Sequence, residues 1–285
     1  MTQVVSFSGG RTSAYLVNLA ILTFGKENVD VVYMDTGAEH TDTYDFIRNC
    51  VKRFGIQITC LRGDFSLPLG DGVGYNIVDI NTITNDVKPF SEMMGKYGIP
   101  YIGGMFCTDR MKLKPFKKYC DSKYGKGAYT TWLGIRADEP RRLTAKKGIK
   151  YLADISDFDK TDVLNWWGEQ SFDLNIPEHL GNCVFCPKKS SLKLAAAQRD
   201  CPEAYTKFVG ALKSPSVRVD GNTGHWSKMY RGRQSLEGLI ATFDGSTGDE
   251  IKSRIRGAKQ LDTNSCSESC EVFGQEEEEI NNDSH

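Results

Sequence analysis

Two groups of residues in this chain have types and spacing that could support chemistry. The first is the stretch SFSGGRTS at residues 6–13, which follows a short apolar run and precedes a helical pattern. Glycines let a turning backbone bring its N–H groups close to a ligand, and a helix N-terminus adds free amides and a favourable dipole. Hydroxyl groups and the charge of Arg11 add further donors. The stretch therefore predicts a cradle for phosphate or sulfate, and the simpler alternative is a serine-capped helix after a tight turn.

The second group is formed by cysteines. Nine of them in a chain without an export signal are more often metal ligands or redox centres than structural disulfides. Cys183 and Cys186 form a C-x-x-C motif followed by proline, a spacing that lets two thiolates hold one metal. Cys107 stands at the start of a basic helical stretch. Three others lie in apolar or helical contexts and are predicted to be buried, inert thiols: Cys50, Cys60 and Cys120.

The elements that must position these residues alternate between strand and helix. Strands are expected at residues 4–7, 29–35, 56–61 and 128–135, and helices at residues 13–24 and from about residue 42. This order predicts an α/β fold with a doubly wound, mainly parallel sheet. Residues 63–106 show no sustained period and predict a long functional or mobile loop. Further helices are expected at residues 108–123, 160–169, 189–199 and 202–213.

Length and charge suggest three parts. Residues 1–180 are expected to form the α/β domain, residues 181–245 a helical appendage that carries the C-x-x-C motif, and residues 246–285 a flexible acidic tail. The last twenty residues hold seven acids and no Lys or Arg, which leaves 36 basic residues against 30 acidic ones elsewhere. A mildly basic body suits an anionic ligand.

No membrane association is expected. The longest apolar stretch, residues 14–24, is too short to span a bilayer, and no basic-then-apolar signal peptide precedes it. The expected location is the cytoplasm, and the sequence leaves the oligomeric state open.

Three motifs in order resemble those of the phosphoadenosine phosphosulfate (PAPS) reductase family, within the PP-loop superfamily of adenine-nucleotide alpha hydrolase-like enzymes. SFSGGRTS is similar to the PP-loop, YMDTGAEH at residues 33–40 to the second-strand signature, and LGIRADEPRR at residues 133–142 to a segment with substrate-binding arginines. All three follow predicted strands, so they should gather at the carboxyl edge of the sheet, where such folds bind ligands.

The resemblance implies that an adenine nucleotide (PAPS, adenylyl sulfate or ATP) binds at this edge. The acidic loop would contact ribose or adenine, and the arginines would hold phosphate or sulfate, with Arg136 also serving catalysis. The plainer alternatives are a helix-capping cluster at residues 35–42 and a solvated basic turn at residues 141–142. The expected nucleotide contacts are Ser6, Ser8, Gly9, Gly10, Arg11, Thr12, Ser13, Asp35, Thr36, Gly37, Glu39, Gly134, Arg136, Arg141 and Arg142.

The same resemblance implies a [4Fe-4S] cluster. Adenylyl-sulfate-reducing members hold one through a Cys-Cys pair and a later C-x-x-C motif, which Cys107, Cys183 and Cys186 match. Phe106 replaces the first cysteine of the pair, so the fourth ligand would be Cys201 or an exogenous group on an open iron. ATP-dependent tRNA thiolation enzymes of the superfamily use such a three-cysteine cluster. A zinc site that includes Cys201 and a redox disulfide of the C-x-x-C pair are the alternatives.

Three functions follow from these patterns. The leading one is sulfonucleotide reduction to sulfite, in which a tail cysteine, here Cys270, is expected to attack the sulfur and a thioredoxin-like reductant to complete the turnover. Glutamates beside Cys270 would raise its thiol pKa, which argues against a poised thiolate. The second is ATP-dependent sulfur transfer to tRNA or DNA, which lysines near residues 112–118 would permit. The third is a non-catalytic nucleotide- or partner-binding module stapled by zinc.

Overall fold

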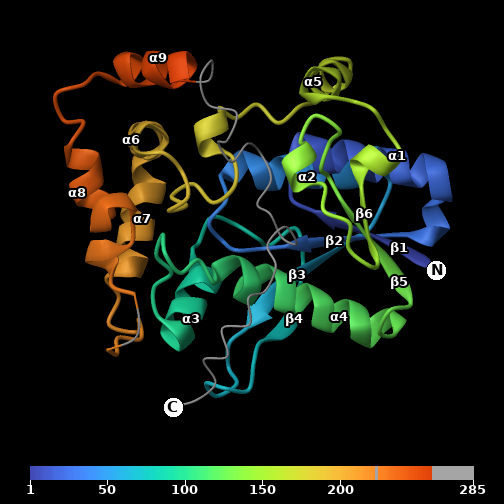
Figure 1. Cartoon of the computed structure of the whole chain (residues 1–285), viewed down its shortest axis with the longest axis horizontal. Helices are drawn as coiled ribbons and strands as arrows, with labels where there is room; N and C mark the ends of the chain where they lie inside the picture. The colour runs from blue at the N-terminus through green and yellow to red at the C-terminus, as the bar shows by residue number, and fades with distance from the viewer. Residues whose placement is uncertain (222–223, 259–285) are drawn as a thin grey trace.

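The computed structural model describes residues 1–221 and 224–258, and a mainly parallel sheet forms its centre (Figure 1). In this described part the sheet has six strands in the order β4-β3-β2-β1-β5-β6, and every neighbouring pair is parallel except β3 with β4. The strands are β1 (Thr2–Phe7), β2 (Val29–Met34), β3 (Ile58–Asp64), β4 (Gly74–Val78), β5 (Tyr129–Leu133) and β6 (Ile149–Tyr151). The predicted α/β fold is confirmed.

Helices cover both faces of this sheet. One face packs against α1 (Arg11–Phe24) and α2 (Thr41–Phe54), with α5 (Lys160–Gly168) packed on the outside of these two helices, and the other face packs against α4 (Lys114–Tyr124) (Figure 1). The chain runs outward from β1 in both directions, through β2 and β3 on one side and through β5 and β6 on the other. β1 therefore ends at a topological switch point, the place where open α/β sheets bind ligands.

Two predicted irregular regions contain regular elements. Within residues 63–106, β4 extends the sheet edge and α3 (Lys88–Tyr97) buries Phe90, Met93 and Met94 on one face. β4 was not predicted, because it is an edge strand whose Ile77 side chain is largely exposed and gives no pattern of burial. Within the predicted tail, α9 (Gly248–Ala258) forms because Ile251 and Ile255 lie one turn apart and are both buried.

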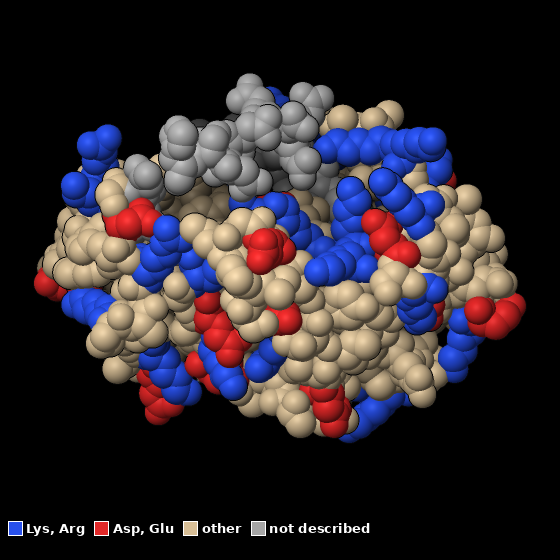
Figure 2. All heavy atoms as spheres, turned by 90° about the horizontal axis from the view of Figure 1, so that it is seen from below, with Lys and Arg blue, Asp and Glu red and all other residues tan. Residues whose placement is uncertain are grey.

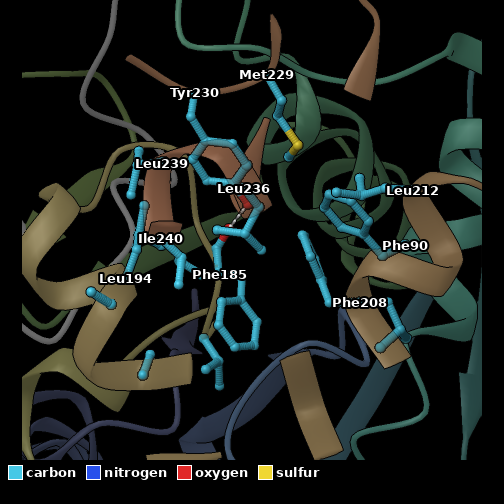
Figure 3. Close-up of a cluster of buried hydrophobic side chains, with 14 of the residues drawn as sticks. Phe90, Phe185, Leu194, Phe208, Leu212, Met229, Tyr230, Leu236, Leu239 and Ile240 are labelled. Atoms are coloured by element: carbon cyan, nitrogen blue, oxygen red, sulfur yellow. Dashed lines mark hydrogen bonds between the residues drawn. The ribbon is translucent and has the colours of Figure 1, made fainter. Parts of the chain in front are cut away.

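The C-terminal helices share one core with α3. They are α6 (Ser191–Asp200), α7 (Pro202–Leu212), α8 (Leu236–Ala241) and α9, and they stand beside the sheet at the left of Figure 1. Their apolar cluster includes Phe90 of α3, Phe185 of the C-x-x-C motif, Phe208 of α7 and Tyr230 (Figure 3). The ring centroids of Phe185 and Phe208 lie 5.6 Å apart. The predicted appendage is thus joined to the α/β part by a common apolar interior.

No helix within residues 1–221 and 224–258 is both long enough and apolar enough to cross a membrane.

Candidate functional site

The glycine-rich loop at residues 8–13 joins β1 to α1. Gly9 adopts a φ of +79°, and a Cβ there would lie 3.0 Å from the side chains of Ile47 and Thr43 on α2, so only glycine fits. Inside the loop, the Ser8 N–H donates to Ser13 Oγ at 3.2 Å, and Ser13 Oγ donates to the Gly10 carbonyl at 3.0 Å. The loop is braced by its own hydroxyls.

The first turn of α1 carries no negative side chain. Its N-cap is Gly10, which has no side chain to cap the helix, and no acidic residue stands in the first turn. The alternative of a serine-capped helix is therefore wrong, because the N-cap is a glycine and the serine hydroxyls bond within the loop. A helix N-terminus without an acidic residue favours a bound anion.

The third motif packs directly against this helix terminus. A Cβ on Gly134 would lie 2.9 Å from Ser13 Cα, so the glycine permits the end of β5 to approach α1. Arg136 is buried, and its Nη1 donates to Thr12 Oγ1 at 3.1 Å while its Nε donates to Asp138 at 2.8 Å. The predicted gathering of the first and third motifs is observed.

The second motif supplies a buried carboxylate. Asp35 is completely buried and accepts hydrogen bonds from the Gly37 N–H at 2.9 Å, from Tyr44 Oη at 3.3 Å and from Arg62 Nε at 2.7 Å. Burial raises the pKa of Asp35, and the Gly37 N–H and the Arg62 charge oppose that rise. Because protein donors occupy its oxygens, Asp35 braces the loop, in contrast to the predicted contact with ribose or adenine.

A pocket lies over the glycine-rich loop. Residues 8–11, Glu39 and Thr43 form one wall, and residues from the segment 174–182 form the other. The space over these residues is about 360 Å³, a volume that includes open solvent, so the pocket is an open depression and not an enclosed cavity. Of the predicted contacts, Ser8, Gly9, Gly10, Arg11 and Glu39 line this pocket.

Buried lysines offset the carboxylates of the pocket. Lys112 Nζ lies 3.9 Å from Glu39, and Lys193 Nζ donates to Glu178 at 2.9 Å. Lys112 belongs to a π-helical turn, Asp109–Leu113, that leads into α4, and such turns often mark functional sites. The pocket therefore combines open helix amides with carboxylates whose charge is balanced from inside the protein.

The predicted arginines take different positions. Arg11 lines the pocket, but its guanidinium makes a bidentate pair with Asp173, with Nε 2.6 Å from Oδ1. Its charge is thus balanced by a carboxylate, whereas the sequence predicted an available cation. Arg142 donates to Glu139, and Arg141 is exposed in the same short turn.

The C-x-x-C turn adjoins the pocket. Cys183 Sγ lies 3.5 Å from both Glu39 Oε1 and Thr36 Oγ1, and the Val184 N–H donates to the Ala38 carbonyl at 2.9 Å. These contacts link the turn to the second motif, so a thiol stands at the edge of the pocket.

A buried lysine ties this turn to the pocket wall. Lys189 Nζ donates to the carbonyls of His179 at 2.7 Å and Val184 at 3.0 Å. Burial lowers the pKa of Lys189 to about 8, and Cys186 together with other nearby acidic groups opposes that fall. Lys189 could not be predicted as a site residue, because a lysine three residues after a cysteine pair carries no signal of burial.

His179 is a second residue that no sequence motif indicated. This buried side chain places Nε2 2.7 Å from Asp200, whose other oxygen accepts from Lys252 Nζ at 2.7 Å. Burial lowers the pKa of His179, and Asp200 opposes the shift. Glu178, the preceding residue, lines the pocket, so the histidine connects the pocket wall with α6 and α9.

Within residues 1–221 and 224–258, no group of three or more Cys, His, Asp or Glu side chains is arranged to hold an ion. Cys201 stands between α6 and α7, and burial raises its thiol pKa. The [4Fe-4S] or zinc centre of Cys107, Cys183 and Cys186 stays a prediction. Cys270 lies outside the described residues.

A Rossmann-like α/β sheet with a PP-loop at its switch point defines the class of protein. Residues 2–66 match the family model of the phosphoadenosine phosphosulfate reductase domain. The chain is 50% identical over 279 residues to an uncharacterized nin region protein of Escherichia phage lambda, with 96% of each chain covered. It therefore belongs to the PAPS reductase family of the PP-loop superfamily.

More distant relatives are two uncharacterized proteins of Methanocaldococcus jannaschii, at 24% and 27% identity. These matches cover 79% and 73% of this chain but only 44% and 47% of the archaeal proteins, so this chain corresponds to less than half of each of them.

Proposed function

We propose that this protein is an enzyme that binds an adenine nucleotide at the PP-loop and reduces a sulfonucleotide to sulfite with its own thiols. The observation that carries the proposal is the position of Cys183. Its Sγ lies 3.5 Å from Glu39 Oε1, and Glu39 and Asn182, the residue before the cysteine, both line the pocket. A thiol of the right type thus stands beside the PP-loop, and Glu39, which accepts its hydrogen bond, would take the thiol proton before the attack.

Binding would use the open first turn of α1. Phosphate or sulfate oxygens would accept from its amides, and the helix dipole would favour their charge. Lys112 balances the negative charge of Glu39, and Lys193 balances that of Glu178. These pairs would lower the electrostatic cost of bringing an anion into the pocket.

The chemistry requires two thiols. The Cys183 thiolate would attack the sulfur of the sulfonucleotide, and the bond between that sulfur and the bridging phosphate oxygen would break, with its electron pair leaving on the nucleotide. The resulting S-sulfocysteine would be attacked at Cys183 Sγ by the Cys186 thiolate. Sulfite would leave with the electron pair, a disulfide would form, and a thioredoxin-like dithiol would reduce it.

The test combines binding with turnover. Isothermal titration with PAPS, adenylyl sulfate, ATP and AMP should show binding, and sulfite should appear when a sulfonucleotide and a dithiol are both present. Cys183→Ser should abolish sulfite release while leaving nucleotide affinity within about threefold, because the thiol is at the edge of the pocket.

Cys270→Ser is the comparison variant for the nucleophile. Sulfite release that is lost in Cys270→Ser and intact in Cys183→Ser would move the attack to the tail. Failure of all four nucleotides to bind at millimolar concentration would overturn the nucleotide site. Conversion of ATP to AMP and pyrophosphate, without sulfite from either sulfonucleotide, would favour the ATP-dependent sulfurtransferase instead.

A further inference from the structure

Residues 225–233 contact the C-x-x-C turn, and two buried side chains of this segment hold it in place. Met229 and Tyr230 are completely buried in the apolar cluster (Figure 3). Tyr230 Oη donates to the Phe185 carbonyl inside the C-x-x-C motif at 2.7 Å, and the Ile102 N–H donates to the Met229 carbonyl at 3.0 Å. The segment therefore has a fixed position beside the cysteines.

The outward side chains of this segment are basic. Lys228, Arg231 and Arg233 are exposed, and Arg231 Nη2 reaches the carbonyl of Lys188, which follows the C-x-x-C motif, at 3.4 Å. Across residues 1–221 and 224–258, no carboxylate lies within ion-pair distance of these four cations. By contrast, nearby Lys213 pairs with Glu237. The segment thus presents positive charge that the described protein leaves unbalanced.

The backbone is strained where it presents the arginines. Gly232 and Arg233 have φ values of +71° and +54°, and the Tyr230 N–H closes the turn on the Gln234 carbonyl at 3.0 Å. A non-glycine residue in the left-handed region costs free energy, and such strain collects at binding sites. The turn projects Arg231 and Arg233 away from the apolar cluster.

Aromatic rings stand at the start of the same segment. The exposed His225 ring lies 5.2 Å from the Trp226 ring, and Ser227 fixes its orientation through a 2.7 Å contact with Nδ1. Lys213 Nζ lies 4.6 Å from the Trp226 centroid. An exposed ring next to cations is the combination that binds single strands, because bases stack on rings while Lys and Arg contact phosphates.

We propose that residues 225–233, together with Lys188, form a binding surface for single-stranded nucleic acid. The inference goes beyond nucleotide binding at the PP-loop and does not depend on it. Because Tyr230 and Arg231 touch the residues at 185 and 188, a bound strand would lie beside the cysteine turn.

A rival basic surface lies on α4. Figure 2, which views the α4 side of the molecule, shows Lys and Arg gathered there. However, Lys114 pairs with Asp109 and Lys123 with Asp30, while the tyrosines on the inner side of α4 pack against the sheet. Lys117 and Lys118 are exposed and have no carboxylate partner in the described chain. They provide a matched control for charge removal.

The test is fluorescence anisotropy of the full-length protein with labelled 20-nucleotide single-stranded RNA and DNA and a duplex of the same sequence, at several salt concentrations. Arg231→Gln/Arg233→Asn uses asparagine because it tolerates a positive φ. It should weaken single-strand binding about tenfold or more and reduce the slope of log affinity against log salt by about 1.4. Lys117→Gln/Lys118→Gln should stay within about twofold of wild type.

A second variant addresses the aromatic part. His225→Asn keeps a capping side chain but removes the ring, so it should weaken single-strand binding about tenfold and leave duplex binding unchanged. Thermal melts confirm that each variant is folded. Absence of oligonucleotide binding by wild type, binding only to phosphatidylserine vesicles, or equal losses in the α4 control would overturn the proposal.

Discussion

Gly134 sets how closely β5 can approach the PP-loop helix. A Cβ at this residue would stand 2.9 Å from Ser13 Cα, a contact with backbone that cannot move aside cheaply. We expect Gly134→Ala to reduce the free energy of unfolding by about 1–3 kcal/mol and to weaken nucleotide binding, since α1 must shift. Gly168→Ala is the control, because a Cβ on Gly168 meets no atom within 4 Å. Denaturant unfolding and titration of both variants check this, and equal effects would contradict it.

Asp35 is expected to matter for stability through its buried pair with Arg62. Removing the charge with Asp35→Asn leaves that guanidinium without its closest carboxylate, so we expect a loss of about 3 kcal/mol in unfolding free energy. Asp86 lies 3.7 Å from the same arginine but is more than a third exposed, so Asp86→Asn should cost under about 1 kcal/mol. Urea unfolding of both variants measures the difference. A similar loss of unfolding free energy in both variants would show that burial of the carboxylate does not determine its contribution to stability.

For single residues, the sequence predicted which side chains lie at the site better than it predicted which side chains they pair with. The PP-loop glycines and Glu39 line the pocket as the motifs predicted. The pairing of Arg11 with Asp173 could not be predicted, because the two are 162 positions apart and only the fold brings them together. The same holds for His179 and Asp200, which sequence reasoning overlooked.

Among the elements, those with strong periodicity or a motif were predictable and the others were not. The central strands are rich in β-branched and aromatic residues, so β1, β2 and β5 could be placed together with the loops that follow them. β4 was not predicted because it is a half-exposed edge strand. α9 was not predicted because Ile251 and Ile255, the two apolar residues that it is described as burying, stand in a polar stretch. Such short elements are stabilised by packing against residues distant in the chain, and the local sequence does not indicate those contacts.

The link between the pocket wall and α6 should make stability depend on pH. Burial holds the folded-state pKa of His179 below its ordinary value, while Lys252 helps to keep Asp200 ionised. The unfolded chain therefore takes up a proton at a higher pH than the folded chain, and stability should fall as pH drops through about 6.5. Melting temperatures between pH 7.5 and 5 should fall less steeply in His179→Gln, which keeps a neutral donor to Asp200. Identical slopes would exclude His179 as the source.

For the whole molecule, the shared core implies that the α/β part does not stand alone. The apolar face of α3, with Phe90 and Met94, packs against Phe185, Phe208 and other C-terminal side chains. A fragment of residues 1–180 would expose this face, so we expect it to aggregate or unfold without a cooperative transition. Circular dichroism and size-exclusion chromatography of the fragment check this. A fragment that melts cooperatively and binds nucleotide would contradict the expectation.

The predicted metal centre is also tested on the whole protein. If the protein holds a [4Fe-4S] cluster, as the family resemblance implies, anaerobically purified protein should be brown and carry about four iron atoms per chain. The Cys183→Ala variant should lose this iron. Iron, sulfide and zinc analysis with a visible spectrum distinguishes the cases. Colourless protein with one zinc would indicate a structural site, and metal-free protein would leave Cys183 and Cys186 available as the redox pair.

The two hydrogen bonds of Lys189 have a mechanical consequence. One ammonium group holds the carbonyl of His179, beside the pocket wall, and the carbonyl of Val184, between the cysteines. A ligand that displaces the wall must therefore move the cysteines or stretch these bonds. Lys189 thus joins the segment beside the pocket wall to the C-x-x-C turn through one buried ammonium group, so we expect ligand binding in the pocket to restrict the motion of the cysteines.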